Sequence, residues 1–222
     1  MKPRFEESFF STSVSAYSMD ALWAQGWRHQ GALFFRYTHC VMMGIEHDIV
    51  PVRIDLRQFT ASKSQRRVWR RNEDLHWVIE PAVIGDDMRE MFYAHSTRFV
   101  ENIPTSLEDF LGEHPASVPC RCHAVKAYLD DRLVACSFLD VGAHAVSSVY
   151  AIFDPEHSKR GLGTLTLLKE IQVAQLNHKH FLYHGFATPL PSHYDYKKNF
   201  SAIHCLDWRT GNWVPREQTT II

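Results

Sequence analysis

The segment from residue 122 to residue 176 constrains the fold more than any other part of this chain. Three β-rich runs are predicted as consecutive strands, at residues 122–129, 133–141 and 144–153. Asp130-Asp131 and Gly142 mark the turns between them. A glycine-containing turn at 154–164 follows, and apolar side chains then recur at helical spacing. An antiparallel meander that leads through such a turn into a helix predicts an α+β fold.

The glycine turn suits an anionic ligand. Gly161 and Gly163 allow the backbone to approach a ligand closely, and the first N–H groups of the following helix point outward at the positive end of its dipole. The arrangement is similar to the one with which GNAT acyltransferases hold an acyl carrier. The pattern alone is also compatible with a merely structural turn.

The remaining segments complete this core and add an irregular N-terminal portion. Further elements are predicted as strands at 33–37, 49–56, 77–79 and 181–186, and as helices near 18–26, at 62–71 and at 86–100. Ser18 is expected to cap the first of these helices, and Ser62 to Gln65 match a capping box at the start of the second. Pro51 should place its strand at a sheet edge or at a strand start. A chain of 222 residues can hold one core and a small appendage. We therefore predict an N-terminal subdomain at 1–75, packed on a GNAT-like core at 76–222.

Charge is unevenly distributed along the chain. The totals of 24 Lys+Arg and 25 Asp+Glu nearly cancel, but residues 53–71 hold seven cations and only Asp55 as an acid. On the helix predicted there, four cations share one face and Arg71 lies beside them; the four are Lys63, Arg66, Arg67 and Arg70. Binding of a nucleic acid would explain this stripe, and a solvated helix face is the alternative.

Composition limits the class of protein further. An apolar fraction of 45% excludes extended disorder, and no run of about 18 uncharged apolar residues is present that could span a membrane. The five cysteines are scattered through the chain, as in a protein with reduced thiols. We expect a cytoplasmic protein with no membrane partner.

Several short motifs support a family resemblance. They are spread over about residues 22–205, at Gly26–Gly31, Pro51–Ile54, Ser62–Arg67, Arg71-Asn72, Ser148–Pro155, Leu162–Leu165, Glu170-Ile171 and Tyr196–Phe200. Taken together and in this order, they resemble the arginyl/leucyl-tRNA–protein transferase family. Its members move an amino acid from charged tRNA to the N-terminus of a protein, and their fold is a small N-terminal subdomain on a GNAT-like core.

One departure from the family concerns a cysteine cluster after the first strand, which in the family resembles a metal or iron–sulfur site. This chain keeps His39-Cys40 but lacks the partner cysteines, so a local thiolate site cannot form. His47 is another residue in this segment that could ligate a metal, although isolated His and Cys residues are more often structural. The run at 120–123 has the wrong spacing for a zinc knuckle. We predict no required metal, and no cofactor besides aminoacyl-tRNA as co-substrate. The altered segment 40–49 leaves the acceptor open: a peptide, a protein N-terminus or a small amine.

The resemblance implies aminolysis of an ester: the α-amine of the acceptor attacks the aminoacyl carbonyl at the terminal adenosine of tRNA. Modest base assistance is enough, because the reference α-amine pKa is about 7.7–8.0. His184 and Tyr150 are the candidate catalytic residues. Arg28 and Arg53 match family positions and are expected to bind an acceptor carboxylate.

Two further sets of residues are predicted around the tRNA. The phosphates are expected to contact Lys63, Arg66, Arg67, Arg70, Arg71, Lys197 and Lys198. The aminoacyl-adenosine pocket is expected to be formed by Ser148, Tyr150, Phe153, Leu162, Gly163, Thr164, Tyr183 and Tyr196. For each of the aromatic residues, plain core packing is the alternative.

Two other functions fit the same features. An acetyl-CoA-dependent GNAT N-acetyltransferase would use the glycine turn but has no evident need for the basic helix. A non-catalytic module that binds tRNA or peptide ends would use the helix without the chemistry. The sequence leaves open whether arginine or leucine is transferred, because an apolar cavity and an acidic one cannot be told apart at this level.

Overall fold

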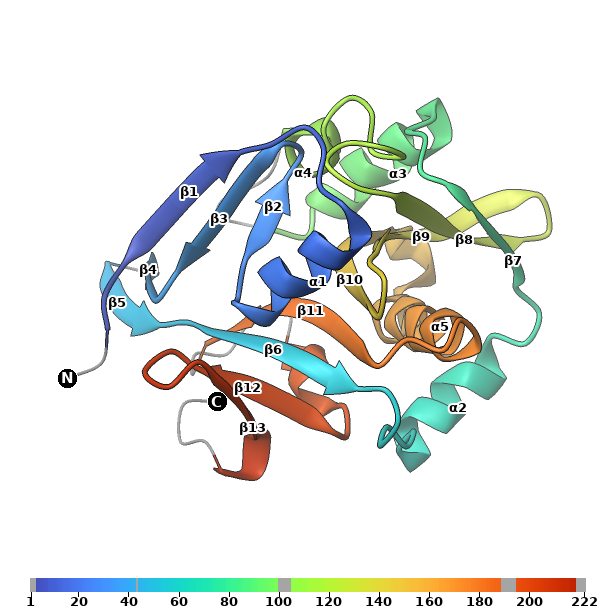
Figure 1. The fold of residues 1–222 in the computed structure, drawn as a ribbon. Helices are drawn as coiled ribbons and strands as arrows, with labels where there is room; N and C mark the ends of the chain where they lie inside the picture. Colours follow the sequence, from blue (N-terminus) through green and yellow to red (C-terminus); the bar gives the residue numbers. More distant parts are fainter. Residues whose placement is uncertain (1–2, 43, 100–104, 189–194, 219–222) are drawn as a thin grey trace.

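The structure is a computed structural model that describes residues 3–42, 44–99, 105–188 and 195–218. Within these residues the largest element is an eight-stranded mixed sheet with the order β13-β12-β6-β11-β10-β9-β8-β7 (Figure 1). Its strands are β6 Val50–Asp55, β7 His76–Pro81, β8 Cys122–Leu129, β9 Arg132–Val141, β10 Ala145–Phe153, β11 Phe181–Ala187, β12 Ile203–Asp207 and β13 Asn212–Pro215. The predicted α+β class is confirmed.

Smaller sheets and helices surround this large sheet. A three-stranded sheet consists of β1 Glu6–Phe10, β2 Arg28–Gln30 and β3 Leu33–Tyr37, and a hairpin consists of β4 His39–Met42 and β5 Ile45–Asp48. The α-helices are α1 Ala16–Ala24, α2 Lys63–Arg71, α3 Asp86–Ser96, α4 Glu108–Leu111 and α5 Leu162–Leu176. Short 3₁₀-helices are η1 Pro155–Arg160, η2 Asp195–Asn199 and η3 Arg216–Gln218. No described helix has the length and apolar character needed to cross a membrane.

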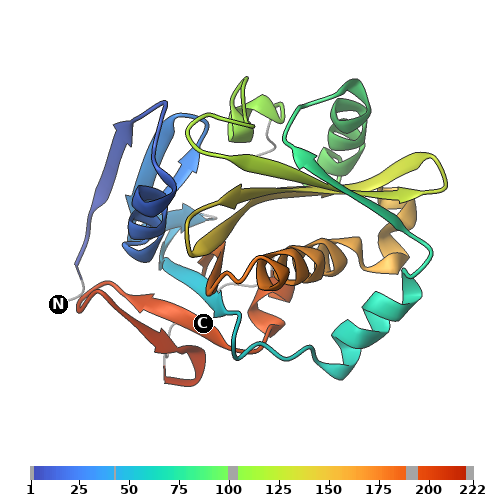
Figure 2. The ribbon, with the colours of Figure 1, turned by 45° about the vertical axis from the view of Figure 1, so that its right-hand side comes forward.

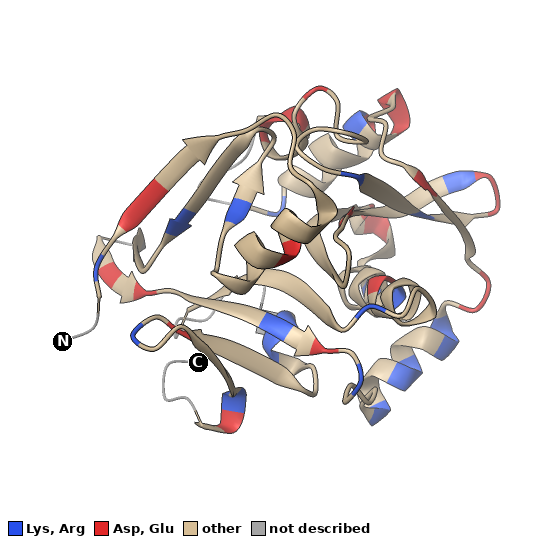
Figure 3. Cartoon of the chain, viewed as in Figure 1, with Lys and Arg blue, Asp and Glu red and all other residues tan. Residues whose placement is uncertain are grey.

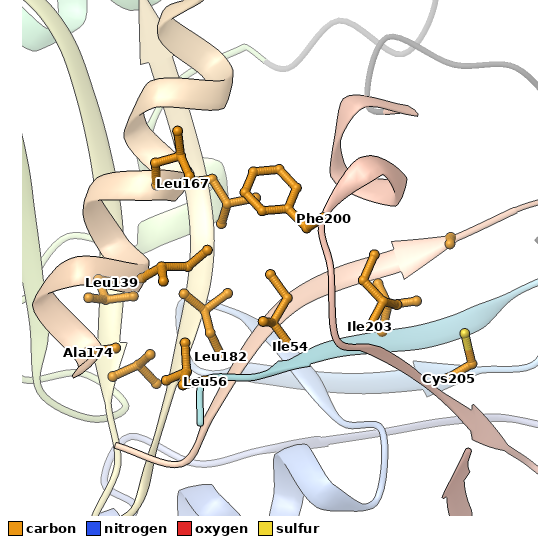
Figure 4. Packing of buried hydrophobic residues seen from close by; sticks show 14 of the residues in the cluster. Ile54, Leu56, Leu139, Leu167, Ala174, Leu182, Phe200, Ile203 and Cys205 are labelled. Atoms are coloured by element: carbon orange, nitrogen blue, oxygen red, sulfur yellow. The ribbon is translucent and has the colours of Figure 1, made fainter. Parts of the chain in front are cut away.

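Helices cover both faces of the large sheet. Helix α5 lies on one face and α3 on the other, as the rotated view shows (Figure 2). Against α5, Leu167 and Ala174 pack with Ile54 and Leu182 from the sheet and with Phe200 (Figure 4). Each fully buried Leu or Ile side chain contributes about 1.5–3 kcal/mol relative to an exposed one. This packing fixes α5, and with it the glycine turn, against the strands.

The sheet splits between its two central strands. Strands β10 and β11 are parallel and pair only where Ala145–Ser147 face Phe181–Tyr183. Beyond that point, bulges shift the register of β10 against β9 at Ser148/Tyr150 and of β11 against β6 at Tyr183/Gly185. A bulge bends its strand away from the regular ladder. The two strands therefore separate, and a gap opens between them that we call the strand split.

Local sequence signals match the structure closely. The predicted meander coincides with β8, β9 and β10 to within one residue, and the capping box of α2 is formed as predicted by Ser62 and Gln65. Pro51 is the second residue of β6 and precedes the pairing of this strand with β12, which begins at Val52, so its strand-start position is confirmed. For α1 the predicted cap was wrong by three residues, because Ser15 accepts the capping hydrogen bond from the N–H of Ser18.

The predicted division at residue 75 stays a prediction. Strand β6 comes from the N-terminal part of the chain, yet it pairs with β11 on one side and with β12 on the other. Residues 50–55 are therefore an inner strand of the large sheet. Strands β12 and β13 were not predicted, although they complete the sheet beyond β6.

Candidate active site

Three charged side chains from distant parts of the sequence converge at the strand split: Arg28 on β2, Glu170 on α5 and Lys197 on η2. The guanidinium of Arg28 donates hydrogen bonds to the Ser147 hydroxyl at 2.7 Å and to the Ser148 carbonyl at 2.5 Å. Burial lowers the pKa of Arg28, and Glu170 is among the carboxylates that oppose this shift. Arg28 therefore places a positive charge where β10 begins to leave β11.

Lys197 brings a second cation to the same place. Its ammonium group donates a hydrogen bond to the His184 carbonyl on β11 at 3.3 Å. Burial and the nearby Arg28 lower the pKa of Lys197 to about 8, and Glu170 opposes the shift. Lys197 as a whole residue is half-buried. A lysine with this pKa is still mostly charged at neutral pH.

Glu170 is the residue of this cluster that the sequence analysis missed as a site residue. It is 1% exposed, and burial raises its pKa to about 7, although the hydroxyls of Ser148 and Ser137 and the charge of Lys197 oppose the rise. Neither carboxylate oxygen makes a hydrogen bond of normal geometry with the described residues. A carboxylate that titrates near neutral pH is suited to accept a proton. The available signal was Glu170 as the one charged residue on the buried face of α5.

His184, predicted as a catalytic base, lies on β11 next to this cluster. It is 1% exposed, and burial together with Lys197 and Arg28 lowers its pKa to about 3. At neutral pH the imidazole is uncharged, and its affinity for a proton is low. Its role as a base stays a prediction, but Glu170 has the more suitable pKa.

A cavity of about 160 Å³ lies beside the glycine turn. Five of the residues predicted for the aminoacyl-adenosine pocket line it together: Phe153, Leu162, Gly163, Thr164 and Tyr196. At Gly163 an added Cβ would lie 3.5 Å from the Phe153 ring and 3.6 Å from the Tyr196 ring, so glycine leaves room there. The first hydrogen bond of α5 runs from the Leu165 N–H to the Gly161 carbonyl at 3.0 Å. The N–H groups of the three preceding residues, 162–164, therefore have no acceptor within the helix.

Helix α3 and the turn directly after it supply lining residues that were not predicted. His95 accepts a hydrogen bond from the Phe153 N–H at 3.2 Å, and burial lowers the pKa of His95 to about 4. The guanidinium of Arg98 lies over the Phe153 ring, 4.3 Å from its centre. None of the described residues that line the cavity carries a carboxylate. Apolar and aromatic side chains form part of its wall, together with the hydroxyl residues Ser158 and Thr164 and one cation, Arg98.

Two of the predicted pocket residues, Tyr150 and Tyr183, do not line this cavity. Tyr150 stacks on Phe110 with ring centres 4.1 Å apart, in the core between β10 and α3. Tyr183 packs against Trp23 and Trp213 on the α1 side of the sheet. For both residues, core packing is the arrangement that the structure shows. Ser148, the last predicted pocket residue, lies at the bulge of β10 beside Glu170.

Arg53 and Arg28 share one partner residue, Tyr183, but contact different atoms of it. Its guanidinium lies 3.8 Å from the centre of the Phe181 ring and 4.4 Å from that of Trp213, and it donates to the Tyr183 hydroxyl at 3.2 Å. Arg28 instead contacts the Tyr183 carbonyl, at 3.4 Å. The two arginines therefore contact opposite ends of Tyr183. Their joint binding of one acceptor carboxylate stays a prediction.

The basic helix α2 forms as predicted and is exposed. Its cations give it a row of positive charge with no acid along its length (Figure 3). Arg71 donates to the Lys159 carbonyl at 2.6 Å, which ties the end of α2 to η1. Lys63, Arg66, Arg67 and Arg70 point outward with exposed side chains. Lys197 was grouped with them, but it lies in the strand split; Lys198 is partly buried on the same 3₁₀-helix.

The segment around Cys40 does not fit a thiolate-bound metal or cluster. Cys40 lies opposite His47 in the β4–β5 hairpin, and burial raises the pKa of its thiol. His39 approaches Glu46, with 3.5 Å between the ring Nε2 and the carboxylate. No second cysteine from the described residues accompanies them, so the ligand set of the family's cluster is absent here.

Another group of metal-ligand types is brought together elsewhere. His29, Cys120 and Asp140 place their donor atoms within 4.8 Å of one another. Both ring nitrogens of His29 already face oxygens, at 2.7 Å from the Asp140 carboxylate and 3.0 Å from the Gly31 carbonyl. The thiol of Cys120 has its pKa raised by burial. The group is therefore a hydrogen-bonded contact between β2 and β9, and the expectation of no required metal stays untested.

Comparison with known proteins decides between the three functions that fit the sequence. A family model described as "Arginine-tRNA-protein transferase, C terminus" matches residues 80–207 of this chain. The chain belongs to the arginine-tRNA-protein transferase family. It is therefore an aminoacyl-tRNA-dependent aminoacyltransferase, as the resemblance implied, with a charged tRNA and an acceptor as its partners.

Curated relatives agree with this family. The aspartate/glutamate leucyltransferase of Marinobacter nauticus (strain ATCC 700491 / DSM 11845 / VT8) is 31% identical over 203 residues, which cover 90% of this chain and 81% of that protein. The enzyme of the same name from Xanthomonas euvesicatoria pv. vesicatoria (strain 85-10) is 34% identical over 176 residues, which cover 75% and 69%.

Likeness to solved structures is weaker and carries no argument about function. L-PGS from Bacillus licheniformis matches with a TM-score of 0.49 and 16% identity, over 65% of this chain and 46% of that one. A tandem GNAT protein from the clavulanic acid biosynthesis pathway matches with a TM-score of 0.42 and 11% identity, over 96% and 61%. The predicted GNAT-like arrangement rests instead on the meander, the strand split and the glycine turn of this chain.

Proposed function

We propose that this protein transfers leucine from leucyl-tRNA to the α-amine of an acceptor that begins with Asp or Glu. One observation carries the proposal: Arg28, Lys197 and Glu170 converge at the strand split, next to the cavity at the glycine turn. An N-terminal Asp or Glu presents one amine and one side-chain carboxylate. The cluster offers the opposite charges to both groups within one site.

The lining of the cavity favours leucine over arginine as the transferred residue. An arginine side chain would need a carboxylate partner, and the described lining offers none. Arg98 would moreover repel a second guanidinium. Phe153, Leu162 and Tyr196 provide apolar surface of the kind that a leucine side chain buries favourably. The name of the relatives, aspartate/glutamate leucyltransferase, supports the same choice.

The reaction forms one amide bond and breaks one ester bond. The neutral α-amine attacks the aminoacyl carbonyl, and the Lys197 ammonium and the N–H groups at the start of α5 stabilise the oxyanion. The proton of the amine passes through the Ser148 hydroxyl to Glu170, whose pKa of about 7 allows it to accept and release a proton. The ester C–O bond then breaks, and the leaving ribose oxygen of tRNA takes up the proton that Glu170 releases.

Arg28 is the residue that we assign to the acceptor carboxylate. Its guanidinium is fixed by two hydrogen bonds to β10 and one to β11, so its orientation is set before the acceptor binds. A fixed guanidinium binds a carboxylate with little further loss of side-chain entropy. This arrangement would reject neutral side chains at the acceptor N-terminus.

Transfer of radiolabelled leucine from leucyl-tRNA to short peptides tests the proposal. Peptides that begin with Asp and Glu should accept leucine at least ~10-fold faster than matched peptides that begin with Asn and Gln, because an unpaired Arg28 costs binding free energy. Equal rates for all four peptides would contradict the assignment of the acceptor. Labelling of a small-molecule extract in place of the peptides would move the acceptor to another chemical class.

A further inference from the structure

A second cavity lies on the basic helix, between α2 and α5. It has a volume of about 310 Å³ and is lined by Ala61, Gln65, Arg66, Trp69, Arg70 and Leu168. Trp69 and Leu168 give it an apolar wall, while the exposed side chains of Arg66 and Arg70 border it. Neither the chemistry proposed above nor the phosphate contacts of α2 require an aromatic cavity at this place.

Its chemistry matches a nucleobase. A flat aromatic side chain offers a stacking surface to any base, and neighbouring arginines hold the phosphates on either side of that base. The Lys169 ammonium lies 5.8 Å from the centre of the Trp69 ring and adds another positive charge. An acidic or apolar peptide would use only part of these features. The combination of an indole with three nearby cations therefore favours a nucleotide over a peptide.

The position of the second cavity agrees with this ligand. Tyr196 on η2 lines the first cavity, and Asn199, at the other end of η2, accepts a hydrogen bond at its carbonyl from Gln65 of the second cavity, at 3.4 Å. Three residues of a 3₁₀-helix rise only about 6 Å. In addition, Val68 of α2 faces Gly161, which lines the first cavity. One nucleotide strand can therefore reach both cavities.

The frame of the second cavity is already fixed. In the capping box of α2, Gln65 accepts a hydrogen bond from the Ser62 N–H at 2.8 Å, and the Ser62 hydroxyl accepts one from the Gln65 N–H at 3.2 Å. Trp69 packs in part against the core beneath it. Gln65 and Trp69 therefore need little further ordering when a base enters, which favours binding.

We propose that the second cavity binds an unpaired nucleobase in the single-stranded 3′ end of tRNA, upstream of the terminal adenosine. The inference rests on the proposed function, because it places the aminoacyl end of the tRNA at the first cavity. Base stacking on Trp69 would hold the strand in register, so that the ester reaches the strand split. The site discriminates a tRNA with a free 3′ end from a fully paired RNA.

The first arm of the test keeps the wild-type protein and alters the tRNA. A set of uncharged tRNAs is prepared in which each tRNA carries a single abasic nucleotide, at a different unpaired 3′ position. Each is titrated against the wild-type protein. One position upstream of the terminal adenosine should weaken binding about 10-fold, in the range of one lost base–aromatic stack. The Trp69→Ala variant should bind intact tRNA about 10-fold more weakly and should no longer respond to that abasic position.

Two further variants separate stacking from folding and from charge. Trp69→Phe keeps a flat ring and should retain most of the affinity and the response to the abasic position. Arg67 lies on the same helix but does not line the cavity. The Arg67→Ala variant should therefore bind every tRNA more weakly by the same factor, and the salt dependence of its binding should be reduced.

Two outcomes would overturn the inference in different ways. If the wild type binds all the abasic tRNAs as tightly as intact tRNA while leucine transfer continues, the nucleobase site is wrong and the proposed function stands. If the wild type binds no tRNA, both are wrong.

Discussion

The guanidinium of Arg28 donates a hydrogen bond of 2.7 Å to the Ser147 hydroxyl, although 119 residues separate the two in the chain. Ser147 is the last residue at which β10 pairs with β11. Arg28 also reaches the Ser148 carbonyl on β10 and the Tyr183 carbonyl on β11. The small sheet around β2 therefore holds the strand split open at the point where it begins.

Replacement of Arg28 by lysine should reduce transfer strongly. A single ammonium group cannot reproduce the forked contacts to both strands, and each lost charge-assisted hydrogen bond costs about 1.5–3 kcal/mol. We expect kcat/KM for the Asp peptide to fall about 10- to 100-fold in Arg28→Lys. Arg36→Lys, in the neighbouring strand β3 and paired with Glu7 at the surface, should change it less than ~2-fold. Equal losses in both variants would contradict the role of Arg28.

The pH dependence of transfer should follow Glu170. Only the ionised carboxylate accepts a proton, and burial raises its pKa to about 7, so kcat/KM should rise with pH through about 7. Glu170→Gln should lower the rate about 100-fold or more, within the range for a lost general base. The rise through pH 7 should disappear and leave only the rise from deprotonation of the acceptor α-amine, whose reference pKa is about 7.7–8.0. The exposed carboxylate of Glu73 provides a matched control, and Glu73→Gln should keep the wild-type profile.

The free energy of unfolding should also depend on Glu170, but it should be higher at low pH, where the carboxylate is protonated. The folded-state pKa of Glu170 is raised from 4.5 to about 7, so its contribution is fully present below pH 4.5 and is lost as the pH rises through about 7. At pH 8 and above the ionised, buried carboxylate should cost up to about 3 kcal/mol relative to a neutral side chain. Urea unfolding should therefore find Glu170→Gln more stable than wild type at pH 8, with the difference shrinking toward pH 4.5. A constant difference would contradict the raised pKa.

Binding of tRNA should depend on the row of cations along α2. When Arg66, Arg67 and Arg70 are replaced together by alanine, affinity should fall, and the slope of log K against log salt should decrease by about 2–3. Filter binding at several salt concentrations measures both values. The corresponding control is Arg132→Ala, which removes an exposed cation paired with Asp154 and Glu156 near the opposite end of η1. If the slope of the triple variant is unchanged, α2 does not contact the phosphates.

The sequence predicted the elements whose signals are local. Alternation and turn residues located β8, β9 and β10, and the capping box located the start of α2, because each of these depends on a few neighbouring residues. Strands β12 and β13 depend instead on pairing that begins with β6, some 150 residues earlier in the chain, as in Ile203 opposite Ile54. Their short runs carried too little pattern to be recognised.

The site was predicted only in part, for reasons of geometry. Phe153 and Tyr150 lie three positions apart on one strand, so their side chains point to opposite faces, and only Phe153 reaches the cavity. Tyr183 likewise points away from α5, opposite to its neighbour Leu182. Glu170 becomes a candidate base only when burial has raised its pKa, and burial depends on how α5 packs against the sheet.

The choice of the donor tests the central claim most directly. Leucyl-tRNA and arginyl-tRNA are offered in parallel to a peptide that begins with Asp, and kcat/KM for transfer is measured for each. Because the described lining of the cavity offers no carboxylate and includes Arg98, we predict a preference for leucine of at least about 100-fold, equivalent to about 3 kcal/mol. Transfer of arginine at an equal or higher rate would contradict the account.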